Sequence, residues 1–255
     1  MKKKYFIKSG KNQIYVRIDF PKKLPTPGVI IAHGLRSYYP GFLNMFAKAF
    51  RDNGHATIVF HFVGTGKSSG KFEDKTTTAM LQNWSDVIKF LKSVPELKTL
   101  GVVGRSNAGA LAALYGPDPK VKAYAFLAPP GYYSMEMGKF IAEAKIKGKF
   151  FYHKSFKRPH TKGAGRLPLS YMSDLKRYDK PLLSGIKKMK PSILVWSTKD
   201  EASPMSEGHF DYWKDHLPQP KKILIIHGGN HSFKGFKQLV VNETVKWFKK
   251  NLPLE

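Results

Sequence analysis

The segment Val102–Leu111, with the sequence VVGRSNAGAL, decides the fold of this 255-residue chain. An apolar run over residues 100–103 leads into Ser106, and a run of small, helix-forming residues, 108–114, follows it. The residues two positions before and after the serine are a glycine and an alanine, and only such small neighbours allow so sharp a turn from strand to helix. The pattern is typical of a nucleophile elbow, in which N–H groups at the helix start face a developing anion. An incidental serine in a buried turn is the alternative.

The composition fits a single domain that spans residues 1–255. Hydrophobic residues make up 42% of the chain, which is enough for a sizeable core. Cysteine is absent, which excludes disulfides, a thiolate nucleophile and metal sites built on cysteine. Lysines follow Met1, but no apolar signal-peptide region comes after them, and no run of about 18 apolar residues could span a membrane. We therefore expect a cytoplasmic protein.

The formal net charge of +26 comes mostly from lysines spread along the whole chain. Three interpretations compete: a solvated lysine-rich surface, an acidic small-molecule substrate, and a nucleic-acid or membrane partner. Nucleic-acid-binding proteins often concentrate their charge in one face or tail, and no such block is present here. The sequence therefore favours the solvated surface, and nucleic acid is not the expected partner.

Short apolar runs alternate with amphipathic segments through most of the chain. The runs predicted to be strands are 4–8, 13–20, 28–32, 56–62, 100–103, 121–127, 192–196 and 222–226. The segments predicted to be helices are 41–53, 78–93, 108–114 and 240–251. This alternation predicts an α/β fold with a mainly parallel, eight-stranded sheet and helices on both faces.

Residues 132–190 interrupt this alternation with a polar and basic stretch that is too long for a loop. We expect it to form a small cap, or lid, inserted after the sixth strand. Its aromatic side chains could line an aryl or acyl pocket or form the core of the cap itself. These aromatic residues are Tyr132, Tyr133, Phe140, Phe150, Phe151, Tyr152 and Tyr171.

The order of these parts resembles that of the α/β hydrolases over almost the whole core. His33 and Gly34 follow the third strand, a glycine-rich segment, 64–70, follows the fourth, and Ser106 follows the fifth. An insertion, an acid and a histidine then follow the sixth, seventh and eighth strands. Within the superfamily the chain is most similar to small carboxylesterases of the feruloyl/cinnamoyl esterase type. It departs from them at Ala108, where glycine is usual, and at residues 61–63, where many relatives carry Asp/Asn-x-Arg.

The resemblance implies a catalytic triad of Ser106, Asp200 and His231, in the chain order of this fold. A serine hydroxyl is a weak nucleophile and needs a neighbouring base, which is a histidine held by a carboxylate. Glu201 is the rival acid and His227 the rival histidine, and in both pairs the family pattern selects the triad member. Ordinary polar loop residues are the alternative for each position.

The resemblance also implies an oxyanion hole built from two backbone amides. One N–H belongs to Asn107, directly after the nucleophile, and the other to Leu35, in the loop after the third strand. His33 and Gly34 shape that loop, although His33 could also be purely structural.

The implied chemistry needs no metal and no organic cofactor. Gly66-Lys67-Ser68 resembles the end of a phosphate-binding P-loop, but His61 stands where that motif requires its first glycine. Nine histidines are present, yet the chain has no His-Glu-x-x-His motif and no cysteine, so we do not expect a metal site.

The first expectation is a carboxylesterase-type serine hydrolase (EC 3.1.1.-) that cleaves a small-molecule ester, anionic or aromatic, through an acyl-enzyme on Ser106. Thioesterase, short-chain lipase and serine peptidase activities use the same triad and stay open. A non-catalytic, anion-binding module is a further alternative because fold does not imply function. The chain could act alone or as a homodimer.

Overall fold

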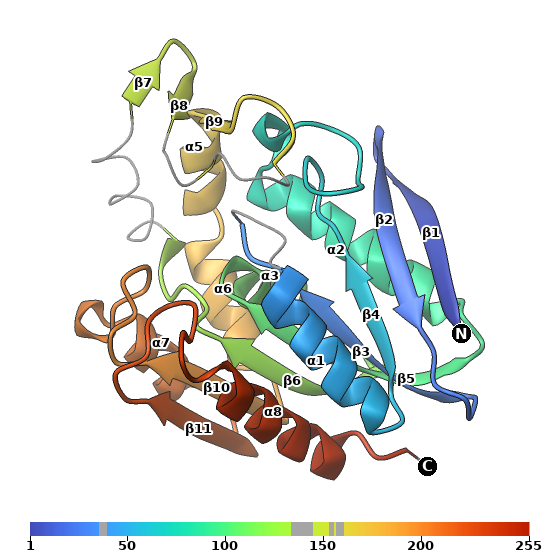
Figure 1. The fold of residues 1–255 in the computed structure, drawn as a ribbon. Coiled ribbons are helices and arrows are strands. Elements are labelled where there is room, and N and C mark those ends of the chain that lie inside the picture. The colour runs from blue at the N-terminus through green and yellow to red at the C-terminus, as the bar shows by residue number, and fades with distance from the viewer. Residues whose placement is uncertain (36–39, 134–144, 153–155, 157–160, 255) are drawn as a thin grey trace.

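The computed structural model describes residues 1–35, 40–133, 145–152, 156 and 161–254. Its centre is an eight-stranded sheet with the order β1-β2-β4-β3-β5-β6-β10-β11 (Figure 1). β1 and β2 form an antiparallel hairpin at one edge, and β2 pairs antiparallel with β4. All other neighbours in this sheet are parallel. The predicted fold class is confirmed. The strands are β1 Lys2–Ser9, β2 Asn12–Asp19, β3 Thr26–Ala32, β4 Ala56–Phe60, β5 Leu97–Arg105, β6 Val121–Leu127, β10 Ser192–Ser197 and β11 Lys221–Ile226.

Helices cover both faces of this sheet (Figure 1). α1 (Pro40–Asp52) and α8 (Lys237–Asn251) pack on one face, and their apolar residues share a core cluster with Val29 and Ile31 of β3. α2 (Thr77–Lys92), α3 (Asn107–Tyr115) and α6 (Asp179–Ile186) pack on the other face. Every residue of β3 is buried, as expected for a strand covered on both sides.

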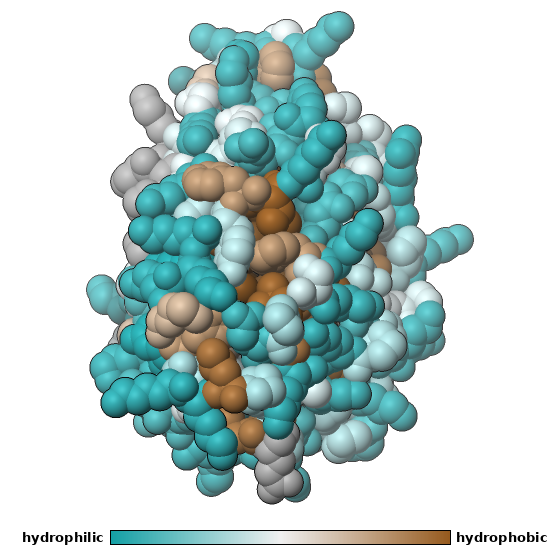
Figure 2. All heavy atoms as spheres, turned by 90° about the vertical axis from the view of Figure 1, so that its right-hand side faces the viewer, coloured by the Kyte–Doolittle hydropathy of each residue, from teal (hydrophilic) through white to brown (hydrophobic). Residues whose placement is uncertain are grey.

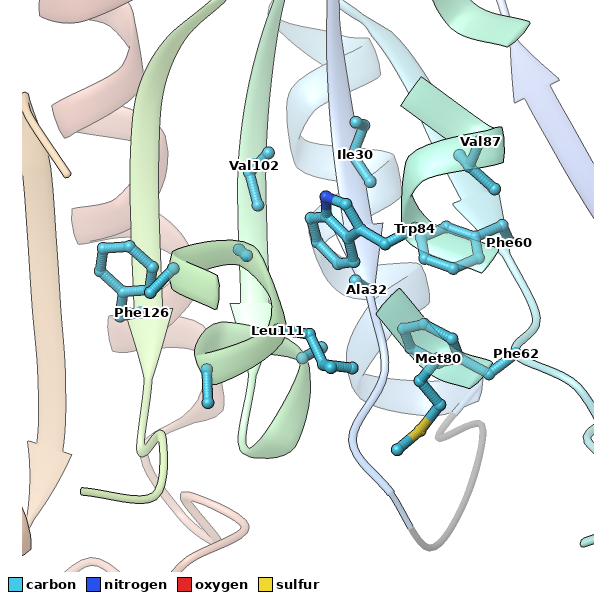
Figure 3. Packing of buried hydrophobic residues seen from close by; sticks show 14 of the residues in the cluster. Ile30, Ala32, Phe60, Phe62, Met80, Trp84, Val87, Val102, Leu111 and Phe126 are labelled. Atoms are coloured by element: carbon cyan, nitrogen blue, oxygen red, sulfur yellow. The ribbon is translucent and has the colours of Figure 1, made fainter. Parts of the chain in front are cut away.

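The apolar stripe of α2 shows how sequence pattern becomes packing. Met80, Trp84 and Val87 recur at helical spacing and face the sheet (Figure 3). The Trp84 ring lies 5.7 Å from that of Phe60 on β4, in an edge-to-face arrangement. At the start of the helix the Thr76 side chain accepts the Ala79 N–H at 3.0 Å, which satisfies one N–H of the first turn. The helix therefore begins at Thr77.

The stretch between β6 and β10 has secondary structure of its own, as the sequence predicted. It contains an antiparallel sheet of β7 (Lys145–Lys147), β8 (Phe150–Tyr152) and β9 (Arg166–Pro168), followed by α5 (Ser170–Lys176) and α6. Tyr133, Phe151 and Tyr171 are buried and belong to the hydrophobic core, as the second of the two alternatives predicted. Phe140 lies outside the described residues. That residues 132–190 act as a cap stays a prediction.

Short helical elements also follow β4 and β10 in the chain. The short helix η1 (Phe72–Asp74) follows the glycine-rich segment, and α7 (His209–His216) follows η3 (Met205–Glu207) after β10. The sequence pattern did not predict α7, because its buried residues are interleaved with charged ones over only a short span.

The face at the β1–β2 edge is mostly hydrophilic, with hydrophobic side chains showing between charged ones (Figure 2).

Part of the positive charge lies on β1, where exposed and less exposed side chains alternate. Lys2, Lys4 and Lys8 are exposed on this edge strand, and Phe6 between them is 57% exposed. Charged side chains on an edge strand oppose pairing with a second sheet. Along this strand the lysines therefore belong to a solvated surface. None of the described helices combines the length and the apolar character of a membrane span.

The parallel strands explain why distant loops meet. β3, β5, β10 and β11 all run in the same direction, so the loops at their carboxyl ends lie at one edge of the sheet. Leu35, Ser106, Asp200 and His231 each stand in one of these loops. The fold thus places these four residues, which the sequence analysis identified as candidates, at the same edge of the sheet.

Candidate active site

Ser106 occupies the tight turn between β5 and α3. Its backbone has φ 53° and ψ −132°, a conformation that a non-glycine residue rarely adopts and that costs about 1–3 kcal/mol. Two backbone hydrogen bonds hold the turn: the Ser106 N–H donates to the Leu127 carbonyl, and the Gly109 N–H donates to the Ser106 carbonyl, both at 2.8 Å. Within residues 100–113 only Ser106 is partly exposed. The turn therefore presents one hydroxyl to solvent from an otherwise buried segment.

Close backbone contact explains the glycine at position 104. A Cβ placed there would lie 2.7 Å from the Gly109 Cα and 2.8 Å from its nitrogen. These are backbone atoms, which cannot rotate away. The first turn of α3 can thus pack on β5 only when residue 104 has no side chain.

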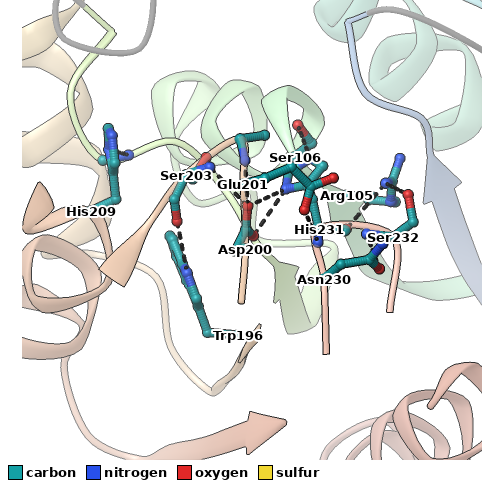
Figure 4. A network of polar contacts seen from close by, with 12 residues as sticks. Arg105, Ser106, Trp196, Asp200, Glu201, Ser203, His209, Asn230, His231 and Ser232 are labelled. Atoms are coloured by element: carbon teal, nitrogen blue, oxygen red, sulfur yellow. Dashed lines mark hydrogen bonds and ion pairs between the residues drawn. The ribbon is translucent and has the colours of Figure 1, made fainter. Parts of the chain in front are cut away.

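His231 connects Ser106 to Asp200 (Figure 4). Its Nε2 lies 3.2 Å from the Ser106 Oγ, and its Nδ1 lies 2.9 Å from both carboxylate oxygens of Asp200. Asp200 can only accept here, so Nδ1 carries the proton and Nε2 accepts from the serine hydroxyl. Both His231 and Asp200 are buried. The structure brings the three predicted triad residues into hydrogen-bond reach of one another.

Backbone donors orient the Asp200 carboxylate. Its Oδ1 accepts the N–H groups of Ala202 at 2.9 Å and Ser203 at 2.8 Å. The rival acid, Glu201, does not reach the imidazole and instead accepts the backbone N–H of His231 at 2.9 Å. The rival histidine, His227, is exposed in the turn after β11. The geometry thus separates each triad candidate from its rival.

Arg105 completes the support of His231, and sequence reasoning did not identify it. Its Nη2 donates to the His231 carbonyl at 3.2 Å and to the Ser232 hydroxyl at 3.4 Å. Glu201 and Arg105 therefore hold the N–H and the carbonyl of the same residue. Glu201 directly follows Asp200 in the sequence, and Arg105 directly precedes Ser106. This adjacency was the only feature of the sequence that could have indicated their supporting roles.

The predicted oxyanion loop lies directly beside the nucleophile. A Cβ added to Gly34 would lie 3.1 Å from the Ser106 Cβ, so only glycine allows this approach without displacement. Asn107 is the first residue of α3, and its N–H has no acceptor within the helix. Leu35 follows Gly34 and is partly buried. The two predicted amides thus belong to segments that flank Ser106.

His33 is buried behind this loop in one defined tautomer. The Phe62 N–H donates to its Nε2 at 3.2 Å, so Nδ1 carries the proton and donates to the Gly34 carbonyl at 2.8 Å. Burial, followed by the nearby Lys75 charge, holds the pKa of His33 well below its usual value of 6.5. His33 is therefore neutral and shapes the loop from the interior.

Within the described ranges, no group of three or more His, Asp or Glu side chains is arranged to hold a metal ion. The described polar groups at Ser106 are instead those of nucleophilic catalysis: a hydroxyl, an imidazole and a carboxylate in sequence. The arrangement can accept the serine proton and stabilise the imidazolium that forms.

A serine in a tight strand-to-helix turn, followed by an acid and a histidine after later parallel strands, defines an α/β hydrolase. The family model described as serine aminopeptidase, S33, matches residues 24–210, and the chain belongs to this family of α/β hydrolases. No curated protein matches the chain in sequence.

Solved structures share the fold over nearly the whole chain. Est1E from Butyrivibrio proteoclasticus, with ferulic acid bound, is 21% identical with a TM-score of 0.78, covering 97% of this chain and 98% of that one. The esterase domain of a Rhodothermus marinus protein is 17% identical with a TM-score of 0.73, covering 98% of both chains. An alpha-beta serine hydrolase homologue from Coxiella burnetii is 18% identical with a TM-score of 0.65, covering 96% of both. The α/β-hydrolase resemblance is thereby confirmed, and the protein is a hydrolase of this fold.

Proposed function

We propose that this hydrolase cleaves carboxylic esters through an acyl-enzyme on Ser106. The observation that carries the proposal is the chain of contacts from the Ser106 Oγ to the His231 Nε2, 3.2 Å, and from the His231 Nδ1 to Asp200, 2.9 Å. These distances allow a proton to pass from serine to histidine while the carboxylate stabilises the imidazolium.

In the first half of the reaction the Ser106 Oγ attacks the ester carbonyl carbon, and its proton moves to the His231 Nε2. The carbonyl oxygen becomes an oxyanion, which accepts hydrogen bonds from the Leu35 and Asn107 N–H groups. When the tetrahedral intermediate collapses, the bond to the alkoxy group breaks. The imidazolium of His231 gives its proton to the leaving alcohol.

In the second half a water molecule takes the place of the alcohol. His231 accepts a proton from this water as its oxygen attacks the acyl carbon. The bond from that carbon to the Ser106 Oγ then breaks, the serine recovers its proton from His231, and the carboxylic acid leaves. The enzyme returns to its starting state without a metal or an organic cofactor.

The charge and the inserted stretch suggest the substrate class. A formal net charge of +26 attracts anionic rather than cationic substrates. Tyr132 is partly exposed at the start of the insertion, where its ring lies 4.2 Å from that of Tyr212. Est1E is seen with ferulic acid, an aromatic acid. We therefore propose aromatic or negatively charged esters as the preferred substrates. Residues 132–190 act as the cap over the site in this proposal.

The second candidate is a serine peptidase, which the family description favours. Its triad chemistry is the same, but the leaving group is an amine. An aminopeptidase would have to bind a cationic α-amino group, which the strong positive charge of the chain opposes.

Hydrolysis of three substrate sets tests these functions: p-nitrophenyl esters of increasing acyl length, methyl esters of hydroxycinnamic acids, and aminoacyl p-nitroanilides. We expect ester hydrolysis by the wild type and a loss of at least ~10³-fold in kcat/KM for Ser106→Ala. Ser184→Ala, at an exposed serine of α6, is the matched control and should keep full activity. Cleavage of the anilides alone would establish the peptidase instead. A folded protein that cleaves nothing would favour the binding module.

A further inference from the structure

Lys75 is a buried lysine next to the predicted oxyanion loop. It directly follows η1, and none of its surface is exposed. Lysine is almost never fully buried unless its charge is paired. Its Nζ donates to the Leu35 carbonyl at 2.8 Å and lies 4.6 Å from the centre of the Phe72 ring. Among the described residues, no carboxylate lies within 4 Å of this ammonium group. A carbonyl and a ring face are thus its partners in the described part of the chain.

Stability gives no reason for a lysine at this position. Desolvation by burial lowers the pKa of Lys75 from its ordinary value of 10.5 to about 7, so the fold disfavours the charged form. An apolar side chain of similar length would fill the same space without this cost. A costly buried charge beside a reactive site indicates a role in that site.

The contacts around Leu35 indicate what this role is. The Leu35 N–H belongs to the Gly34–Leu35 peptide, whose carbonyl oxygen is held by His33 at 2.8 Å. The next peptide carbonyl, that of Leu35 itself, is held by Lys75. In a trans peptide the N–H points opposite to the carbonyl, so fixing both carbonyls fixes the direction of the N–H between them. That segment packs against Ser106 through Gly34.

We propose that Lys75 is a positioning residue, which holds the Leu35 carbonyl so that the Leu35 N–H points at the oxyanion formed on Ser106. The proposal rests on the esterase function proposed above. Oxyanion-hole donors are effective because they are oriented before the reaction begins. A displacement of about 1 Å can lower a rate by about 10²-fold. Lys75 therefore acts on the transition state and not on substrate binding.

A purely structural role for Lys75 is the competing explanation. η1 is already attached to the inserted stretch by other contacts. The Phe72 N–H donates to the Lys162 carbonyl at 2.8 Å, and Glu73 contacts the Arg166 Nε at 3.3 Å and the Ala164 N–H at 2.9 Å. None of these bonds uses the Lys75 ammonium. Removing the ammonium group should thus leave η1 in place.

The charged groups around Lys75 predict how its effect depends on pH. From the loop after β3, neutral His33 faces it. From η1, Glu73 is engaged by Arg166, and Asp74 accepts the Lys71 N–H at 2.7 Å and lies 3.9 Å from the Lys11 Nζ. No described carboxylate therefore keeps Lys75 charged as the pH rises. Loss of its proton near neutral pH weakens its hold on Leu35, which adds an alkaline limb to the pH profile of kcat.

Lys75→Met tests the proposal, with Lys71→Met as the matched control. Lys71 is exposed in the same turn, so both variants lose one charge near the site. We would measure kcat and KM on a p-nitrophenyl ester from pH 6 to 9, together with the affinity for phenylboronic acid, which forms a tetrahedral adduct with an active serine. We expect Lys75→Met to lower kcat about 10- to 100-fold, to lower the boronate affinity similarly, and to remove the alkaline limb. KM should change less than about 3-fold, and Lys71→Met should match the wild type.

Three outcomes would overturn the proposal. Unchanged kcat and boronate affinity would show that Lys75 does not position the loop. A raised KM with unchanged kcat would make it a substrate-binding cation instead. A lower kcat that keeps the alkaline limb would point to a general structural effect. If Lys75→Met fails to fold, Lys75→Gln provides the same readouts. A wild type that binds the boronate but cleaves no ester would defeat the esterase function, and the boronate affinities would still decide the role of Lys75.

Discussion

The carboxylate of Glu201 accepts the backbone N–H of His231 at 2.9 Å, while its neighbour Asp200 binds the imidazole of the same residue. Two consecutive acids thus hold one histidine at different atoms. The contact of Asp200 sets the tautomer and stabilises the imidazolium during the proposed reaction, whereas that of Glu201 only anchors the backbone. This division of roles leads to different expectations for the two acids.

Asp200→Asn should lower kcat about 10³- to 10⁴-fold, because an amide cannot stabilise the imidazolium and can select the wrong tautomer. Glu201→Gln retains an oxygen acceptor for the His231 N–H and should lower kcat less than about 10-fold. Steady-state hydrolysis of one p-nitrophenyl ester by both variants measures the difference. Equal losses would mean that the two acids share the catalytic role.

Gly104→Ala should destabilise the protein by about 1–3 kcal/mol, the usual cost of overpacking. The new Cβ would lie 2.7 Å from the Gly109 Cα, so α3 must shift away from β5. Gly41→Ala is the control, because a Cβ there meets nothing within 4 Å on an exposed part of α1. Urea unfolding of both variants gives the free energies. A Gly104→Ala variant as stable as Gly41→Ala would contradict the close packing of this turn.

Gly34→Ala should lower kcat about 10- to 100-fold with little loss of stability. The added Cβ would lie 3.1 Å from the Ser106 Cβ, so the partly buried loop moves and carries the Leu35 N–H out of alignment. Ester hydrolysis and thermal unfolding of the same preparation measure the two effects. Full activity would show that the Leu35 amide is not an oxyanion donor.

The buried Lys75 makes stability depend on pH above neutrality. Its pKa is about 7 in the folded chain and 10.5 as its ordinary value, so between these values the unfolded chain binds the extra proton. The free energy of unfolding therefore rises as pH increases from 7, by about 2–3 kcal/mol at pH 9. Urea titrations of the wild type and Lys75→Met at both pH values isolate this contribution. The rise should be smaller in Lys75→Met, and an identical rise in both proteins would exclude Lys75 as its source.

The central sheet was predictable because its parallel strands contain short apolar runs that are followed by glycine, proline or polar residues within a few positions. The order of the loops then followed from the rule that parallel strands share their carboxyl edge. Strand limits were less accurate: β5 begins at Leu97 and not at Leu100, because Leu97 pairs with Thr26 on the neighbouring strand. Such pairing depends on another part of the chain and leaves no local pattern.

The residues that support the site, Lys75 and Arg105, could not be predicted from the sequence for a similar reason. Lys75 is one of 44 basic residues, and nothing around it distinguishes a buried lysine from an exposed one. Its partner Leu35 stands 40 residues earlier, and the Arg105 contact with His231 spans 126 residues. These contacts form only after the sheet has brought its loops together. Ser106, in contrast, could be predicted from the small residues on either side of it.

The position of β10 and β11 after the inserted stretch has a consequence for the newly made chain. Synthesis proceeds from the N-terminus, so the segment with Ser106 leaves the ribosome well before those with Asp200 and His231. In the proposed mechanism, the serine therefore has no base to remove its proton until β11 joins the sheet and the loop with His231 is in place. A nascent chain would thus be inert toward esters in the cell, and the onset of turnover would report that the last strand has docked.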